Sequence, residues 1–205
     1  MNIYRNIYPN VILEDDITIG LFVIIGEPSR GNLPGELPTK IGKNAVIRSH
    51  TVIYAGNVIG YDFQTGHNVL IREENNIGNN VSIGSHSIIE HHVKIGDNVR
   101  IHSNTFIPEY SIIDDGAWIG PCVVFTNARY PRSKTVKENL SGPHVQSNAK
   151  IGAGAVLLPG IIIGQGALIG AGSVVVSNVP DGVLVVGNPA RMIKYTRDIE
   201  AYMTD

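Results

Sequence analysis

Residues 88–110, "IIEHHVKIGDNVRIHSNTFIPEY", repeat an isoleucine at every sixth position and place histidine, asparagine, glutamate and glycine between them. The repeat extends well beyond this stretch, since thirteen of the fifteen positions spaced six apart in residues 41–125 are isoleucine. A second block in residues 151–175 and a shorter one in residues 7–25 keep the same step with Ile, Leu or Val. A hexapeptide period therefore governs most of the chain.

This period of six matches neither the helical period of 3.6 residues nor the two-residue period of an amphipathic strand. It matches a solenoid of short strands and tight turns, in which isoleucine points into the core and glycine relieves strain at the turns. Three hexapeptides make a triangular coil of about 18 residues, and successive coils stack at about 4.8 Å. We therefore predict an all-β parallel β-helix over residues 1–187, with residues one coil apart in sequence lying above one another.

Two stretches interrupt the repeat. Residues 27–40, rich in proline and glycine, and residues 127–150 are predicted to leave the coil as loops, and loops of the second length are usually functional. Residues 188–205 are predicted to form a short C-terminal α-helix, with Asn188 as N-cap and Pro189 in the first turn. Such a helix would cover the last coil, which otherwise presents an open strand edge.

Composition narrows the function classes. The net charge of −2 and the pI of about 6.4 argue against nucleic acid or an anionic membrane as the main partner. The single cysteine, Cys122, rules out an intramolecular disulfide and fits a reducing compartment. The N-terminus lacks the basic-then-apolar order of a signal peptide, and there is no run of about 18 apolar residues that could cross a membrane. We expect a cytoplasmic protein.

The predicted stacking aligns polar residues into columns. One column reads His50, Asn68, His86, Asn104 and Cys122, a second reads Ala55, Glu73, His91, Glu109 and Asn127, and a third, beside the second, contains Tyr110. Outward turn positions of any β-helix are polar, which is sufficient explanation for a single residue. The two polar columns together favour a site, because a histidine flanked by carboxylates, as expected for His91, is a recurring acid–base arrangement.

The segments "IGDNVRIHSN", "IGAGAVLLPGIIIGQGALIGAGSVVV" and "VVGNPARMIK" resemble the hexapeptide-repeat acyltransferases, and the resemblance covers nearly the whole chain. It implies a left-handed parallel β-helix, although right-handed crossovers are the general preference. It also implies homotrimers with sites between subunits, acetyl-CoA as acyl donor and no metal. Here the arm of coenzyme A would lie along small turn residues, with basic side chains near its phosphates. The positions implied for it are Lys150, Gly152, Ala153, Gly170, Ala171, Arg191 and Lys194.

The segment "RIHSNTFIPEY" and the later "FTNARYPRS" resemble the subgroup that N-acetylates nucleotide-linked amino sugars for surface glycans such as lipopolysaccharide O-antigen. The resemblance implies that Asn104 holds the sugar amine near the thioester. It places Asn127, Tyr130 and Arg132 against sugar or nucleotide, and the columns add His86 and Tyr110 to the substrate site.

The motif "IIEHH" resembles the bacillosamine and sialic acid branch of the same family, which implies His91 as base with Glu109 or Glu73 as its carboxylate. That branch commonly has an acidic residue where this chain has His92. In the first subgroup the sugar amine can lose its own proton, so the base stays open. The chain has no room for the extra N-terminal α/β domain of some bacillosamine-type enzymes, which favours a 3-amino-3-deoxy or 3-amino-3,6-dideoxy hexose as acceptor.

Three alternatives remain. An oxygen acceptor would make the protein a sugar O-acetyltransferase. The γ-class carbonic anhydrases share the fold and hold zinc with three histidines across a subunit interface, and His50, His86 and His91 have the matching spacing. A non-catalytic β-helix scaffold is the third, but it would not need stacked His, Asn and Glu at its corners. Metal analysis tests the zinc alternative, and thioester-dependent turnover would exclude the scaffold.

Overall fold

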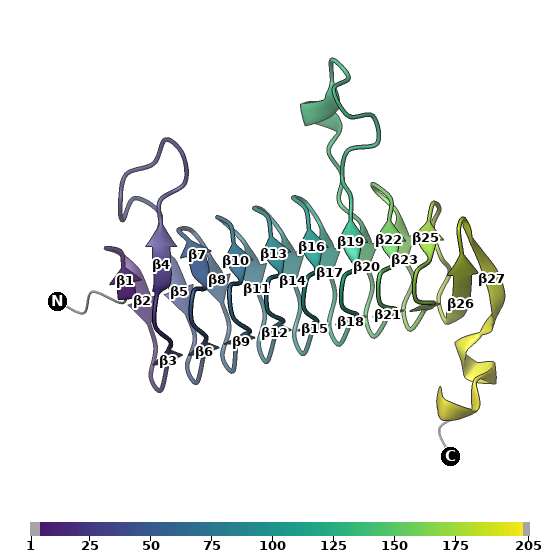
Figure 1. The fold of residues 1–205 in the computed structure, drawn as a ribbon, viewed down its shortest axis with the longest axis horizontal. Helices are drawn as coiled ribbons and strands as arrows, with labels where there is room; N and C mark the ends of the chain where they lie inside the picture. The colour runs from purple at the N-terminus through teal and green to yellow at the C-terminus, as the bar shows by residue number, and fades with distance from the viewer. Residues whose placement is uncertain (1–4, 203–205) are drawn as a thin grey trace.

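The computed structural model describes residues 5–202, and these form one β-solenoid (Figure 1). Its strands lie in three sheets that run the length of the molecule, with strand order β1-β4-β7-β10-β13-β16-β19-β22-β25 in sheet A, β2-β5-β8-β11-β14-β17-β20-β23 in sheet B and β27-β26-β24-β21-β18-β15-β12-β9-β6-β3 in sheet C. All neighbouring strands are parallel except β26 and β27. Each coil contributes one strand to each sheet, as a period of three hexapeptides predicts.

The strands are short, most of them two or three residues long. Sheet A contains β1 (Arg5–Ile7), β4 (Val23–Glu27), β7 (Val52–Tyr54), β10 (Leu70–Ile71), β13 (Ile88–Ile89), β16 (Phe106–Ile107), β19 (Val124–Phe125), β22 (Val156–Leu157) and β25 (Val174–Val175). Sheet B contains β2 (Val11–Leu13), β5 (Thr39–Ile41), β8 (Val58–Ile59), β11 (Asn76–Ile77), β14 (Lys94–Ile95), β17 (Ile112–Ile113), β20 (His144–Val145) and β23 (Ile162–Ile163). Sheet C contains β3 (Thr18–Ile19), β6 (Val46–Ile47), β9 (Gln64–Thr65), β12 (Ser82–Ile83), β15 (Arg100–Ile101), β18 (Trp118–Ile119), β21 (Lys150–Ile151), β24 (Leu168–Ile169), β26 (Val183–Gly187) and β27 (Ala190–Tyr195).

Strand pairing follows the predicted columns. Ile71 pairs with Ile89, and Ile89 with Ile107, so the isoleucines one coil apart stack directly above one another. All three are fully buried, and they belong to one hydrophobic core that extends through the coils. The preceding residue of each strand points outward, because successive side chains of a strand alternate between its two faces. The prediction of a parallel β-solenoid is confirmed.

The turns explain part of the polar pattern. The second turn residue takes a left-handed backbone, with φ near 60° at His50, His86 and Asn104. Asn, Asp, His and Gly tolerate that conformation better than other residues, so the column that contains Asn104 has a backbone reason to be polar. The column that contains His91 and Glu109 is at the preceding turn position, where φ is not positive. Its histidine and carboxylates therefore need another explanation.

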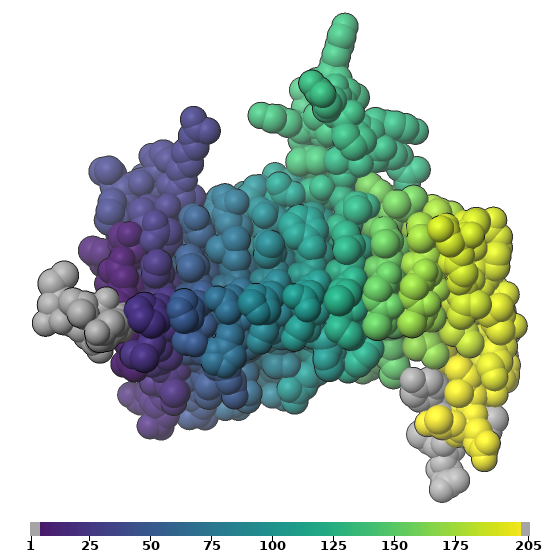
Figure 2. Space-filling view, viewed as in Figure 1, coloured from purple at the N-terminus to yellow at the C-terminus, as the bar shows by residue number. Residues whose placement is uncertain are grey.

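Two loops leave the coil (Figure 1), and Figure 2 shows the second standing clear of the packed body. The first connects β4 to β5. The second connects β19 to β20 and contains the 3₁₀ turn η1 (Val136–Asn139). The coil resumes at His144, inside the stretch 127–150 that sequence reasoning assigned to a loop, and His144 pairs in register with Ile112. The second loop is thus an insertion into an otherwise regular stack.

The predicted C-terminal α-helix over residues 188–205 is wrong for the part of it that the structure describes. The strand β27 pairs antiparallel with β26, and two 3₁₀ turns follow, η2 (Thr196–Asp198) and η3 (Glu200–Tyr202). The peptide bond Asn188–Pro189 lies in the hairpin turn and is cis. The physical reason for the strand is that β26 offers an open edge, whose backbone groups β27 pairs and a helix would leave unpaired. Residues 203–205 lie outside the described residues.

No helix in the described part of the chain is long and apolar enough to cross a membrane.

Candidate functional site

The turns between sheets A and B carry a group of charged and amide side chains that touch one another across several coils. We name this group the corner cluster, and its members are Arg72, Glu73, Glu90, His91, Glu109 and Asn127. The side chains stack because β10, β13, β16 and β19 are consecutive in sheet A. Polar groups so arranged above an apolar core can act on one bound ligand.

His91 is the centre of the corner cluster. Its Nε2 lies 3.6 Å from Glu109 Oε1, and Asn127 Nδ2 donates a hydrogen bond to Glu109 Oε2 at 2.5 Å. The column therefore places Glu109 and Asn127 as the sequence predicts. His91 Nδ1 is buried and has no hydrogen-bond partner among the described residues. An imidazole with one nitrogen beside a carboxylate and the other unpaired can accept or deliver a proton.

Glu73 does not complete the pair of carboxylates expected around His91. Its carboxylate instead accepts two hydrogen bonds from Arg72, from Nε at 2.8 Å and from Nη2 at 3.0 Å. Burial is the largest influence on the Glu73 carboxyl and acts to raise its pKa. The hydrogen bonds from Arg72, a backbone hydrogen bond and the nearby charges of Arg72 and His91 together outweigh burial and hold that pKa below its usual range. Arg72 Nη1 also lies 3.4 Å from Glu90 Oε2. Burial of the Glu90 carboxyl has a larger effect than the charge of Arg72, so the pKa of Glu90 is raised.

The lowered pKa of Glu73 predicts a pH-dependent stability difference. A carboxyl with a depressed folded-state pKa stabilises the fold above its unfolded-state pKa, and this stabilisation is lost as the pH falls through the folded-state value. Glu73→Gln should therefore lower the free energy of unfolding at neutral pH, and the gap to wild type should close below about pH 4. Urea unfolding of both proteins across this pH range measures the stability difference. A difference that does not change with pH would contradict a lowered pKa for Glu73.

Sequence reasoning missed Arg72 and Glu90. Their signal was present, because Tyr54, Arg72 and Glu90 form a column one turn position before the column of His91. The Arg72 guanidinium also lies 5.1 Å from the centre of the Tyr54 ring, a cation–π distance. Tyr110 was predicted as a substrate contact, and its ring centre lies 6.1 Å from that of His91 in an edge-on arrangement.

Asn104 and His86 lie in turns between sheets C and A, at the opposite edge of sheet A from His91. One chain therefore does not unite the two polar columns. The three histidines of the zinc alternative are divided in the same way, because His50 and His86 stand two coils apart in one column and His91 lies at the other edge of sheet A. Among the described residues, the side chains whose potential metal-ligand atoms gather within 4.8 Å are Glu90, His91 and Glu109.

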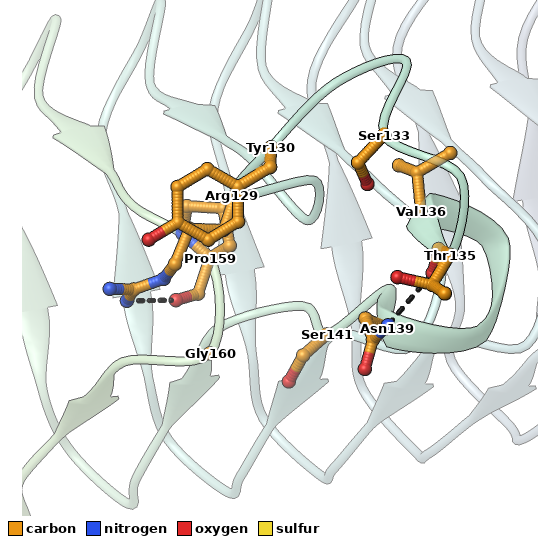
Figure 3. A pocket seen from close by; sticks show the side chains of 9 residues that line it. All are labelled: Arg129, Tyr130, Ser133, Thr135, Val136, Asn139, Ser141, Pro159 and Gly160. Atoms are coloured by element: carbon orange, nitrogen blue, oxygen red, sulfur yellow. Dashed lines mark hydrogen bonds between the residues drawn. The ribbon is translucent and has the colours of Figure 1, made fainter.

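The long loop forms a cavity of about 500 Å³ with the coil (Figure 3). Tyr130, predicted to contact substrate, lines it, and Arg129 Nη2 donates a hydrogen bond to the Pro159 carbonyl oxygen at 3.2 Å. The other lining side chains are mainly hydroxyls and an amide, from Ser133, Thr135, Asn139 and Ser141. Arg132 is exposed on the same loop and does not line the cavity.

The positions implied for coenzyme A gather at the C-terminal end of the molecule. One row across sheet C consists of Lys150 on β21, Leu168 on β24, Leu184 on β26 and Lys194 on β27. Arg191 also lies on β27, three residues before Lys194. Gly152 and Gly170 have a packing reason to be glycine. A Cβ added at Gly152 would lie 2.5 Å from the backbone nitrogen of Ala171, and one added at Gly170 would lie 2.5 Å from Val186 Cγ1.

The model of the bacterial transferase hexapeptide family (six repeats) matches residues 76–109 and 142–177. A 2,3,4,5-tetrahydropyridine-2,6-dicarboxylate N-acetyltransferase of Clostridium perfringens is 48% identical over 50 residues, which are 24% of this chain and 21% of that protein. A serine acetyltransferase of Buchnera aphidicola is 52% identical over 52 residues, 25% of this chain and 20% of that protein. The match thus spans about a fifth of the length of each curated relative.

The crystal structure of LpxA from Acinetobacter baumannii has the same fold, with a TM-score of 0.54 and 16% sequence identity over 95% of this chain and 73% of that one. The family model thus matches about a third of the chain, and the likeness to LpxA shows a shared fold.

Proposed function

We propose that the protein transfers an acetyl group from acetyl-CoA to the amine of a nucleotide-linked amino sugar, a 3-amino-3-deoxy or 3-amino-3,6-dideoxy hexose. The observation that carries this proposal is the corner cluster, in which a partly buried His91 lies beside Glu109, whose carboxylate accepts a hydrogen bond from Asn127. Two relatives that each match about a quarter of this chain are named acetyltransferases. We place the reaction in the cytoplasm, as expected from the sequence composition, and in the biosynthesis of surface glycans such as O-antigen, as the family resemblance implies.

The chemistry asks for a base and for groups that orient it. As the amine nitrogen attacks the thioester carbonyl, His91 takes the amine proton. The C–S bond then breaks, and the departing thiolate of coenzyme A takes that proton from the imidazolium and leaves as the thiol. Glu109 stabilises the protonated imidazole, and the hydrogen bond from Asn127 holds the Glu109 carboxylate in place. An amine that has already lost its proton would need only the positioning that Asn104 provides.

An apolar row on sheet A supports the homotrimer that this proposal includes. The outward row of sheet A is apolar along eight coils, with Ile24, Val52, Leu70, Ile88, Phe106, Val124, Val156 and Val174 at half-buried or exposed positions. A continuous apolar surface of this kind is typical of an interface. In a homotrimer of left-handed coils, a second chain packed on this row would bring its Asn104 column toward His91, and the site would be shared between subunits.

Coenzyme A fits the small-residue turns near the C-terminus. A Cβ built at Gly154 or Gly172 meets no atom within 4 Å, so both turns leave open space beside the exposed Ala153 and Ala171. Lys150, Arg191 and Lys194 lie at the same end of sheet C and carry charges that suit its phosphates. Acetyl-CoA would supply the thioester, and these residues would hold its arm.

Removal of the Asn104 side chain should affect turnover far more than stability. Alanine at this left-handed position would add a backbone cost of about 1–2 kcal/mol, so Asn104→Gly is the cleaner variant. We expect kcat/KM to fall by about 100-fold, since the amine loses its positioning group, with urea unfolding nearly unchanged. Asn98→Gly is the matched control, because Asn98 has the same backbone conformation at a different corner. Equal activity in both variants would remove Asn104 from the site.

The test of the function is thiol release from acetyl-CoA by the purified protein. The panel should contain UDP- and dTDP-linked amino sugars, with hydroxyl-bearing sugars as the arm for O-acetylation. Release with one amino sugar would establish the transferase and name its acceptor. Coenzyme A binding without release from any acceptor would show that the acceptor class is wrong. If coenzyme A does not bind either, the acetyltransferase proposal fails and metal content becomes the next measurement.

A further inference from the structure

One long edge of the coil, where sheet C turns into sheet A, carries no carboxylate in its regular turns. Residues 48–50, 66–68, 84–86 and 102–104 contain Arg48 and four of the seven histidines of the chain, His50, His67, His86 and His102, but no Asp or Glu. The other two edges hold the carboxylates of the coil, among them Glu73, Glu90 and Asp97. A chain of net charge −2 therefore presents one edge that attracts anions.

A groove of about 250 Å³ runs along this edge on the face of sheet C. Arg48 bounds it at the end nearer the N-terminus, and Arg100 and His102 bound it at the other end. Gly66 and Gly84 line it, and both have a packing reason to be glycine, because a Cβ at either position would lie 2.3 Å from a backbone nitrogen of the next coil, that of Ser85 or Ser103. Ligand pockets measure about 300–1,000 Å³, so this groove suits part of a ligand rather than a whole nucleotide sugar.

The two arginines lean toward each other over neighbouring strands. Arg48 Nη1 donates to the Thr65 carbonyl oxygen on β9 at 3.1 Å, and Arg100 Nη1 donates to Ser82 Oγ on β12 at 3.1 Å. Strands β9 and β12 are adjacent in sheet C, so these two contacts lie about 4.8 Å apart along the stack. Within residues 5–202, neither guanidinium has a carboxylate at ion-pair distance. Each guanidinium has five N–H donors in a planar fork that suits phosphate oxygens.

We propose that this groove binds a diphosphate, and that in the proposed reaction, on which this assignment rests, it holds the diphosphate of the nucleotide-linked acceptor. Two guanidinium forks that contact adjacent strands of one groove suit two linked phosphates, and the Ser82 hydroxyl adds a neutral donor. His102 and Ser103 line the groove, and the residue that follows them in the same turn is Asn104, which is proposed to hold the sugar amine. Arg48 and Arg100 would thus make the enzyme select phosphorylated acceptors.

Coenzyme A also carries phosphates, and binding measurements separate the two sources. The purified protein is titrated calorimetrically with UDP, dTDP, inorganic pyrophosphate and coenzyme A at one fixed ionic strength. Arg48→Gln and Arg100→Gln are the variants, and both side chains are exposed, so folding should be unaffected. Lys94→Gln is the control, because it removes an equal charge from the exposed face of sheet B.

We expect each arginine variant to raise the Kd of the preferred nucleoside diphosphate, and of pyrophosphate, by about tenfold or more. The Kd of coenzyme A should stay within about twofold, and Lys94→Gln should leave every Kd within the same range. Absence of nucleotide and pyrophosphate binding by the wild type would overturn the assignment. So would an unchanged Kd in both arginine variants, or a loss confined to coenzyme A.

These measurements do not depend on turnover, so failure of the groove and failure of the proposed reaction are distinguishable. Nucleoside diphosphate binding that weakens in the arginine variants, in a protein that acetylates no acceptor, would keep the groove and overturn the reaction. Acetylation of a nucleotide-linked sugar with the same KM in wild type, Arg48→Gln and Arg100→Gln would keep the reaction and overturn the groove.

Discussion

Replacing His91 by asparagine should lower kcat for acetyl transfer by about 100- to 10,000-fold, the usual contribution of a positioned general base. The His91 imidazole has its Nε2 beside the Glu109 carboxylate, and its Nδ1 has no hydrogen-bond partner among the described residues. Asparagine keeps a polar side chain of similar reach but cannot take the amine proton. The measurement is the pH profile of kcat, whose acid limb should be lost in the variant together with most of the rate.

His144→Asn is the matched control. His144 Nε2 lies 2.8 Å from Asp114 Oδ2 on sheet B, so it is also a half-buried histidine paired with a carboxylate, but away from the corner cluster. This control should retain wild-type kcat and the wild-type pH profile. If His91→Asn also retains the acid limb and most of the rate, the substrate amine deprotonates without the protein, and Asn104 is left as the main catalytic contact.

Several parts of the fold could be predicted from the sequence because each depends on a local rule. Isoleucine at every sixth position defines the core, and stacking then determines which residues meet, as Ile71, Ile89 and Ile107 do. The C-terminal segment could not be predicted in this way. Its sequence has a helix-like start at Asn188 and Pro189, but the open edge of β26 determines its conformation. A competing tertiary contact is invisible to capping rules.

The site was predictable in columns but not in detail. Stacking correctly places Asn127, Glu109 and His91 together, because their backbones repeat at the coil spacing. The side chains then choose among several neighbours, and Glu73 bonds to Arg72 because an adjacent arginine offers two donors. The column rule carries no information about such contacts between neighbours in one turn. The column rule also does not distinguish a column that is polar because its backbone is left-handed, as at Asn104, from one that is polar for function.

Ile95→Ala is expected to have the largest effect on stability, at about 2–5 kcal/mol. Ile95 is 4% exposed and stacks between Ile77 and Ile113 in sheet B, so its removal leaves a cavity that fixed coils on both sides cannot close. Each coil of a solenoid is stabilised by its neighbours, so the loss weakens two interfaces at once. Urea unfolding of the variant measures the effect.

A graded series tests whether packing is the cause. Ile95→Val removes a single methyl group and should cost about 0.5–1.5 kcal/mol. Lys94→Ala changes the adjacent residue, which points outward and is exposed, and it should stay within about 0.5 kcal/mol of wild type. A cost for Ile95→Ala no larger than that for Lys94→Ala would mean that the isoleucine column does not form the core. The register of every polar column, and with it the approach of Glu109 to His91, depends on that core.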